Sequence, residues 1–220
     1  LEFRRVLFRS SISLFLQSSY PAPFRSLYIA DDFGDVPTVA LPKDRNVKCF
    51  STQNRFPSLG AKYNRLAELA VSDGAEVLIV WEDDDIYFSD HIDNCVYALR
   101  FDERPATKPG CVIFSAEDGF RIEGTGCSYH SCFALRGEAW KAGNFWPDDL
   151  AGNFDQRFMG QFSASDSLIC GLDKRVHPTT HVFRWNSGYW HGQALMQNDQ
   201  PNCGTEWWGR AKIEVARGNP

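Results

Sequence analysis

The chain has 220 residues, of which 43% are hydrophobic and 23% are charged, and its formal net charge is −5. This length accommodates one substantial α/β domain and excludes a large multidomain architecture. A negative chain without a basic stripe excludes nucleic acid as the main partner, but a nucleotide substrate stays compatible because a bound cation can neutralise its phosphates.

In chain order, the first segment is a basic stretch of ten residues, LEFRRVLFRS. It begins with Leu-Glu-Phe, which is typical of a cloning linker. Its charges are spread through it rather than placed ahead of an apolar stretch, so we do not expect a signal peptide here. We expect residues 1–10 to be a non-native linker and residues 11–220 to form a single domain.

The next predicted elements are the end of a helix and two short strands. Residues 11–19 (SISLFLQSS) are typical of the end of an amphipathic helix. The alternation at residues 26–30 predicts a strand that stops at an acidic turn, DDFGD, and residues 47–50 predict a second strand.

A helix, a buried strand and another helix follow. Ser58 is a suitable N-cap for a helix that begins at Leu59 and ends at Gly74. Consecutive aliphatic residues within 76–81 (EVLIVW) predict a strand buried on both faces, as in a parallel sheet covered by helices. Ser89 can cap the next helix, whose apolar face would carry Ile92, Val96 and Leu99.

The alternation of helices and strands, with a further strand at residues 111–114, predicts an α/β fold with an open, mostly parallel sheet and flanking helices. Residues 119–208 are rich in glycine, aromatic residues and short polar turns, and six of the seven tryptophans lie between residues 140 and 208. We expect this region to be less regular and to cover the carboxyl edge of the sheet, where ligands bind in such folds.

No stretch approaches the roughly 18 apolar residues that a membrane-spanning helix needs, so no transmembrane segment is predicted. The seven cysteines include no Cys-x-x-Cys pair, which argues against a disulfide framework and a structural zinc site. Small buried thiols in a reducing compartment are the favoured interpretation, and we therefore expect a cytoplasmic protein.

Four adjacent carboxylates, Glu82, Asp83, Asp84 and Asp85, follow the predicted buried strand. Such close charges repel one another and raise each other's pKa values unless a cation lies among them. Oxygen ligands of this kind suit Mg²⁺ or Mn²⁺. A solvated acidic turn is the alternative, but the carboxyl end of a central strand favours a metal site.

The order of four motifs resembles that of the family-2 glycosyltransferases. In that family, a helix ending in a Gln-x-x-Tyr-Pro-like turn leads into a strand and Asp-Asp-Gly-Ser, which is similar to LFLQSSYPAPFRSLYIADDFGD. A Gly-Ala-x-x-Asn helix is matched by LGAKYNRLAELA, and an apolar strand with an Asp-x-Asp-type motif by EVLIVWEDDDIYFSDHI. A Gly-Gly-Phe-Asp segment ahead of a Glu-Asp motif is matched by AGNFDQRFMGQFSASDSLICGL. The resemblance covers residues 11–181.

This resemblance implies a GT-A, Rossmann-like fold and a metal-dependent enzyme with Mn²⁺ or Mg²⁺ as cofactor. The enzyme would transfer a sugar from a nucleotide-diphosphate donor, a UDP-sugar first of all, to a glycan or other hydroxyl acceptor with inversion. Residues 11–118 would form the nucleotide-sugar-binding half, and residues 119–220 the acceptor side. The family's first strand and its nucleotide-contacting turn are expected ahead of Ser11, where residues 1–10 contain no such pattern.

The resemblance also implies roles for individual donor-site residues. Asp32 would hydrogen-bond the nucleotide base, and Asp31 would support its turn. Asp83 would lie near the ribose or phosphate. Asp84 would bind the metal, and Asp85 would be a second ligand or an outer partner.

On the acceptor side, Asp166 resembles the general base of an inverting transferase, which would take the proton of the attacking hydroxyl. Ser165 replaces the family's usual Glu, and a helix start at Ser165-Asp166 is the alternative. Tyr63 stands where an Arg commonly meets the base. Either Lys62 or stacking by Tyr63 could replace that Arg.

Several late residues admit both a functional and a structural interpretation. Three histidines could supply a further metal ligand or be hydrogen-bonded within the fold: His177, His181 and His191. Four tryptophans could form a sugar-stacking platform or pack beneath an irregular lid: Trp140, Trp146, Trp185 and Trp190.

Two other functions stay open. The first is a nucleotide-sugar-binding module that is catalytically incomplete. The second is a metal-dependent phosphatase, because Asp83-Asp84-Asp85-Ile86 follows a buried strand as an Asp-x-Asp nucleophile motif does, although Tyr87 stands where Thr or Val is usual.

Overall fold

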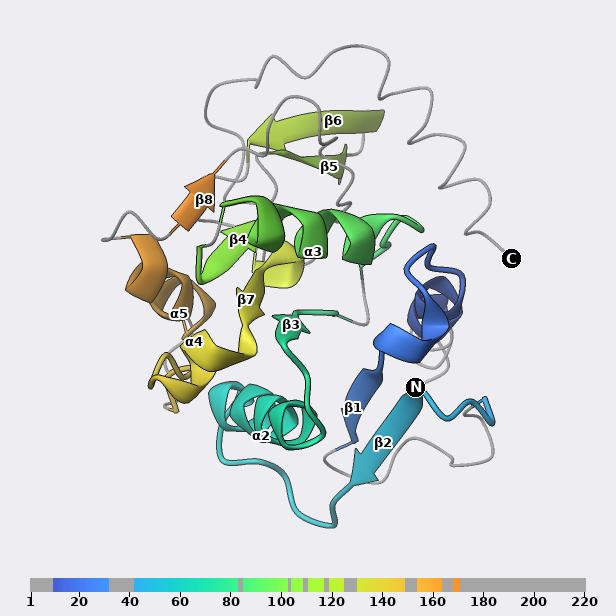
Figure 1. Ribbon diagram of the computed structural model, residues 1–220, viewed down its shortest axis with the longest axis vertical. Coiled ribbons are helices and arrows are strands. Elements are labelled where there is room, and N and C mark those ends of the chain that lie inside the picture. Colours follow the sequence, from blue (N-terminus) through green and yellow to red (C-terminus); the bar gives the residue numbers. More distant parts are fainter. Residues whose placement is uncertain are drawn as a thin grey trace.

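The computed structural model describes residues 10–31, 42–82, 85–102, 104–108, 111–116, 119–124, 130–148, 154–163 and 168–170. A helix at residues 10–16 comes first (Figure 1). The strands are β1 (Leu27–Asp31), β2 (Val47–Ser51), β3 (Val77–Ile79), β4 (Ala106–Lys108), β5 (Cys111–Ala116), β6 (Gly119–Gly124), β7 (Ala134–Arg136) and β8 (Leu168–Cys170). The further helices are α2 (Leu59–Ser72), α3 (His91–Asp102), α4 (Gly137–Lys141) and α5 (Phe154–Ser163), with 3₁₀ turns η1 (Ala22–Phe24) and η3 (His130–Cys132).

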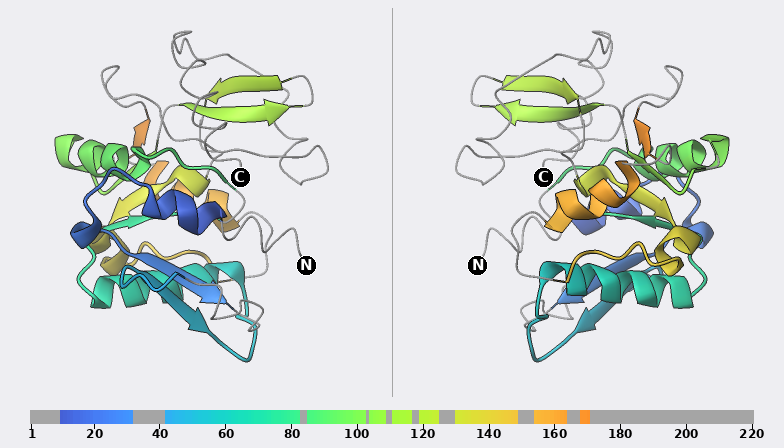
Figure 2. Two further views of the ribbon diagram at one scale, coloured as in Figure 1. Left: turned by 90° about the vertical axis from the view of Figure 1, so that its right-hand side faces the viewer. Right: turned by 90° about the vertical axis from the view of Figure 1, so that its left-hand side faces the viewer.

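The described strands form three groups. β1 and β2 pair in parallel, with Leu27 opposite Val47 and Asp31 opposite Ser51. A four-stranded sheet has the order β3-β7-β4-β8, in which β7 runs antiparallel to both neighbours and β8 runs parallel to β4. β5 and β6 form an antiparallel hairpin, which lies at the opposite end of the molecule from β1 and β2 (Figure 2). The predicted α/β class, with parallel strands and flanking helices, is confirmed.

Helices cover both faces of β3, as its apolar sequence predicts. Leu78 is buried in a cluster with α2, α5 and β7. Val77 and Ile79 pack instead against the cluster that the helix at residues 10–16 forms with β1 and α3. Successive side chains of a strand point to opposite faces, so β3 needs apolar residues at every position.

Two expectations about the sheet need correction. The segment 76–81 forms a strand of only three residues, and its partner β7 is antiparallel rather than parallel. β7 also comes from the region predicted to be an irregular cover, yet Ala134 and Leu135 are fully buried within the sheet. A region that looks irregular in sequence therefore supplies part of the core. Its strand was not predicted because three buried residues are too few to show a period.

The predicted helices at residues 59–73 and around Ile92 are both present, but α3 begins at His91, so Asp90 and not the predicted Ser89 stands in its N-cap position. The Ser58 side chain accepts a hydrogen bond from the Ala61 amide, which makes Ser58 the N-cap of α2. Gly74 follows this helix with φ of 91°, a left-handed conformation that favours glycine. The predicted apolar face of α3 is buried, as the exposures of Ile92, Val96 and Leu99 show.

Cys95 lies on α3 and packs against Leu99 and Ala134. It is a buried free thiol, and burial raises its pKa to about 12. For Cys95 the structural interpretation is therefore confirmed.

In the described part of the chain, no helix has the length and apolar composition needed to cross a membrane. A strand ahead of Ser11, which the resemblance leads us to expect, would fall outside the described residues.

Candidate functional site

The acidic run begins three residues after β3 ends. Glu82 and Asp85 are described, whereas Asp83 and Asp84 lie outside the described residues. Asp85 is a buried carboxylate, only 3% exposed. A buried carboxylate within a run of four acids concentrates negative charge at this strand end.

Glu82 is held by a chain of side-chain contacts that crosses from β3 to η3. Its Oε1 lies 3.2 Å from Nδ1 of His130, and Nε2 of His130 lies 2.7 Å from Nε1 of Trp146. An indole N–H can only donate, so Nε2 of His130 accepts and Nδ1 carries the ring's proton. That proton is then donated to Glu82, which fixes the direction of the first carboxylate of the run.

Tyr87 anchors the other end of the same loop. Its hydroxyl accepts a hydrogen bond from the Glu82 amide (2.8 Å) and donates one to the carbonyl of Ser131 (3.0 Å). Burial raises the pKa of Tyr87 well above its usual value, and the charges of Asp85 and Glu82 raise it further. The phenol therefore stays protonated and keeps its donor, so the acidic loop is tied to η3 at two points.

His91 packs against two aromatic side chains next to the acidic run. Its ring centroid lies 4.7 Å from that of Tyr87 and 5.6 Å from that of Trp81. It is fully buried, and burial lowers its pKa to about 3. In the folded state the ring is therefore neutral throughout the mildly acidic range.

This burial predicts a pH dependence of stability. The unfolded chain protonates His91 below about pH 6.5, whereas the folded chain does not until about pH 3. The contribution of His91 to stability should thus be constant above pH 6.5 and fall as the pH is lowered, by up to about 1.4 kcal/mol per pH unit. Urea unfolding of the parent and of His91→Phe at pH 7.5 and pH 5 measures this, since the variant should show a smaller loss by up to about 2 kcal/mol. Equal losses in the two proteins would contradict it.

The Gly-Ala-x-x-Asn motif has a structural explanation in its contacts with residues 146–148. The Asn64 side chain donates to the Trp146 carbonyl (2.8 Å) and accepts from the Trp146 amide (3.0 Å). Ser58 donates to a carboxylate oxygen of Asp148 (2.6 Å). Gly60 passes so close to Pro147 that a side chain there would overlap its main-chain oxygen. We call this set of contacts the α2 clamp.

Tyr63 lies within an aromatic cluster. Its ring stacks against Trp146 (5.4 Å between centroids) and Phe154 (6.0 Å) and meets the edge of His130 (5.0 Å). Tyr63 therefore packs against the same His130 that holds Glu82. Lys62 is half-buried at the start of α2, and the choice between Lys62 and Tyr63 as the base-contacting residue stays a prediction.

Asp31 ends β1 and is 6% exposed. Its carboxylate accepts a hydrogen bond from the Ser51 hydroxyl (3.0 Å), and its main-chain oxygen accepts one from the Thr52 amide (2.9 Å). These contacts join the end of β1 to the end of β2, whereas the turn that Asp31 is expected to support lies outside the described residues.

The tryptophans that are described pack within the fold. Trp146 is 3% exposed and stacks on Phe158 with 4.0 Å between ring centroids, so it belongs to the core and is not a sugar platform. Trp140 packs partly buried against the same core, edge-on to Phe145.

Several predicted residues lie outside the described part of the chain, so the structure does not test them. Among the described residues, no group of three or more potential metal-ligating side chains occurs. Asp83 and Asp84, the two central carboxylates of the acidic run, are not described and so were not part of that comparison. The untested residues are Asp32, Asp83, Asp84, Asp166, His177, His181, His191, Trp185 and Trp190.

Sequence analysis missed His130 and Tyr87 as parts of the site. His130 stands 48 positions after Glu82, and nothing in its neighbourhood marks it as a partner. Tyr87 offered a weak signal, since an aromatic residue with a hydroxyl that is buried usually has a hydrogen-bond partner. The site therefore depends on a supporting layer that only the fold brings together.

Helices on both faces of a sheet, with an acidic run at a strand end, agree with the glycosyltransferase fold. No protein-family model matches the chain, and neither does any curated protein. Solved structures of TarS, a glycosyltransferase from S. aureus, do match.

TarS 1–349 in complex with UDP-GlcNAc matches with a TM-score of 0.59 and 10% identity, over 80% of this chain and 54% of that one. Its complex with UDP matches with a TM-score of 0.54 and 11% identity, over 79% and 52%. The structure of TarS itself gives 0.55 and 12%, over 69% and 30%. The chain thus spans about half of TarS 1–349, and the likeness establishes a glycosyltransferase-type fold.

Proposed function

We propose that this chain is the nucleotide-sugar-binding core of a family-2 glycosyltransferase, which moves a sugar from a UDP-sugar to a hydroxyl acceptor with inversion. The observation that carries this proposal is the acidic run at the end of β3, in a fold similar to that of proteins solved with UDP and UDP-GlcNAc. Since the chain spans about half of those proteins, the activity of the whole protein is part of the proposal.

A divalent cation fits the chemistry of the residues after β3. The side chains of residues 82–85 offer only carboxylate oxygens, the ligands that Mg²⁺ and Mn²⁺ prefer, and one of these residues, Asp85, is buried. Asp84 and Asp85 would hold the cation, with Asp83 near the ribose or phosphate. The cation's chemistry would be to stabilise the negative charge of the departing diphosphate.

The described residues support this site by holding it in place. The contacts of Glu82 with His130 and of the Glu82 amide with Tyr87 fix the beginning of the acidic loop before any ligand arrives. A preorganised site loses less free energy in ordering its groups on binding. At the other strand end, Asp31 would support the turn from which Asp32 would meet the base.

Asp166 would act as the general base, taking the proton of the acceptor hydroxyl as its oxygen attacks the anomeric carbon. Asp166 itself lies outside the described residues, between the end of α5 at Ser163 and the start of β8 at Leu168. β8 pairs with β4 in the same sheet as β3.

Donor calorimetry combined with a transfer assay tests the proposal. UDP-sugar should bind in the presence of Mn²⁺ and lose measurable binding with EDTA. Asp166→Asn should keep this binding and lower the transfer rate by about 10²–10⁴-fold, as expected for loss of a general base. Metal-independent binding would contradict the cation site, and retained transfer by the variant would contradict the base.

The alternative, a binding module without turnover, makes a different prediction in the same experiment. The parent chain would bind UDP-sugar with Mn²⁺ but would neither transfer nor hydrolyse it.

A further inference from the structure

Lys108 is the last residue of β4, and only 1% of its surface is exposed. Among the described side chains, it is the one lysine or arginine that is buried. Its Nζ has no hydrogen-bond partner in the described part of the chain. Removing an ammonium group from water without a partner is costly, so a lysine at this position calls for an explanation.

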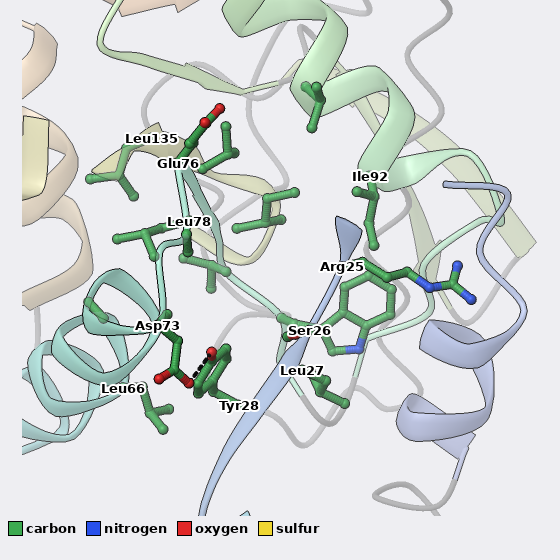
Figure 3. A pocket seen from close by; sticks show the side chains of 18 of the residues that line it. Arg25, Ser26, Leu27, Tyr28, Leu66, Asp73, Glu76, Leu78, Ile92 and Leu135 are labelled. Atoms are coloured by element: carbon green, nitrogen blue, oxygen red, sulfur yellow. Dashed lines mark hydrogen bonds between the residues drawn. The ribbon is translucent and has the colours of Figure 1, made fainter. Parts of the chain in front are cut away.

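The partly buried cations at the cavity between β1 and β3 do have partners. Lys48 lies 2.6 Å from the Asp73 carboxylate, which also accepts a hydrogen bond from the Tyr28 hydroxyl (Figure 3). Arg25 and Arg136 line the same cavity and donate to main-chain carbonyl groups. The buried lysine of β4 differs from them in having no such partner.

The sheet topology places Lys108 at the edge where the acidic run begins. β3 and β4 both run antiparallel to β7, which lies between them, so their carboxyl ends share one edge of the sheet (Figure 1). Thr107 is opposite Ala134, and Ala134 is opposite Ile79. Lys108 therefore stands level with the residue after Ile79, at a distance of two strand spacings or about 10 Å. The acidic run starts two residues further along β3's direction.

Lys108 also belongs to the face of the sheet that supports Glu82. Side chains two positions apart in a strand share a face, and Ala106 of the same strand is buried in a cluster with Phe158. The ring of His130, which holds Glu82, meets Phe158 edge-on, with 6.1 Å between the ring centroids. The lysine and the first carboxylate of the run are therefore associated with the same side of the sheet.

The acidic run leaves this edge short of positive charge. The run has four carboxylates, and one divalent cation compensates only half of their full negative charge. The diphosphate of a nucleotide-sugar donor would bring further negative charge to the same place. A cation fixed about 10 Å away in a protein interior attracts that charge more strongly than a cation in water would.

We propose that Lys108 supplies a fixed positive charge to the donor site and thereby favours the donor diphosphate at the end of β3. The charge acts across the distance between the strands, without contact. This inference rests on the proposed function, because the donor is the ligand that it concerns. A buried charge kept for this purpose lowers the stability of the ligand-free chain. Loss of the charge should therefore change stability and donor affinity in opposite directions.

Lys108→Met tests the inference on the full chain, because methionine keeps an unbranched side chain and removes the charge. At saturating Mn²⁺ the variant should bind UDP at least about tenfold more weakly than the parent. A separation of about 10 Å at an effective dielectric constant of about 20 gives roughly that factor for each ligand charge. Uridine has no phosphate and should bind the two proteins equally, within about twofold. Calorimetry measures the binding of UDP, and an NMR titration measures that of uridine.

Thr107→Val is the matched control. The Thr107 hydroxyl is also buried without a hydrogen-bond partner among the described residues. It carries no charge, so its loss should leave UDP binding unchanged. Urea denaturation should show that Lys108→Met has a higher free energy of unfolding than the parent, because an unpaired buried charge has been removed.

The outcomes separate this inference from the function on which it rests. A parent chain that binds no UDP with Mn²⁺ would overturn the proposed function and this inference with it. If the parent binds UDP and Lys108→Met binds it equally well, this inference alone is wrong, and tighter binding of Mn²⁺ by that variant would assign the charge to the carboxylates instead. Equal losses for UDP and uridine, or a lower free energy of unfolding, would show that Lys108 has a structural role.

Discussion

Gly60→Ala is expected to lower the free energy of unfolding by about 3 kcal/mol. In an ordinary helix the same change would be stabilising by about 1 kcal/mol, since alanine has the better helix propensity. Here the added methyl group would overlap the main-chain oxygen of Pro147 and lie 2.8 Å from its carbonyl carbon. Both are backbone atoms, so relief requires that α2 and residues 146–148 separate and break the α2 clamp.

Urea denaturation of the parent and the variant measures the loss. Ala61→Gly at the next position is the matched control, because it changes the same helix turn and should cost only about 1 kcal/mol through propensity. A Gly60→Ala protein as stable as the parent would show that the close approach to Pro147 is absent in solution.

The second large effect is expected at the cation site. Asp84→Ala should weaken Mn²⁺-dependent binding of UDP-sugar by at least about a hundredfold, which corresponds to about 2.7 kcal/mol. The unfolding free energy should change little, because removal of one of four adjacent acids also relieves repulsion. Calorimetry at fixed Mn²⁺ gives the binding change, and urea denaturation gives the stability.

Glu68→Ala is the control for charge. It removes one carboxylate from the exposed side of α2, where Glu68 pairs only with Arg65 among the contacts described, and it should leave donor binding unchanged. If Asp84→Ala binds UDP-sugar as tightly as the parent, the proposed cation site is misplaced.

Local signals made the helices predictable. Ser58 marks the start of α2 and Gly74 follows its end, as the sequence indicates. An N-cap hydroxyl and a left-handed glycine determine where a helix starts and ends through the residues beside them, so both signals can be read locally. The burial of α3 follows from the spacing of Ile92 and Val96. The position of the acidic run at a strand end was predictable for the same reason, since the aliphatic residues of β3 immediately precede it.

Long-range partners were not predictable. β7 has three residues and no period, so its place between β3 and β4 emerges only in the assembled sheet. His130 reaches Glu82 through the fold and not through spacing. The family resemblance marked Gly60 and Asn64 as a motif, but the contacts that explain both residues lie more than 80 positions away in the chain.

The α2 clamp also has a consequence for synthesis of the chain. Its hydrogen bonds join residues that are separated by 82 and by 90 positions in the chain. The pairing of β3 likewise requires β7, which is synthesised much later. On the ribosome, α2 and β3 would therefore emerge long before their partners, with apolar surfaces still uncovered. We expect folding to be completed only after α5 has left the exit tunnel.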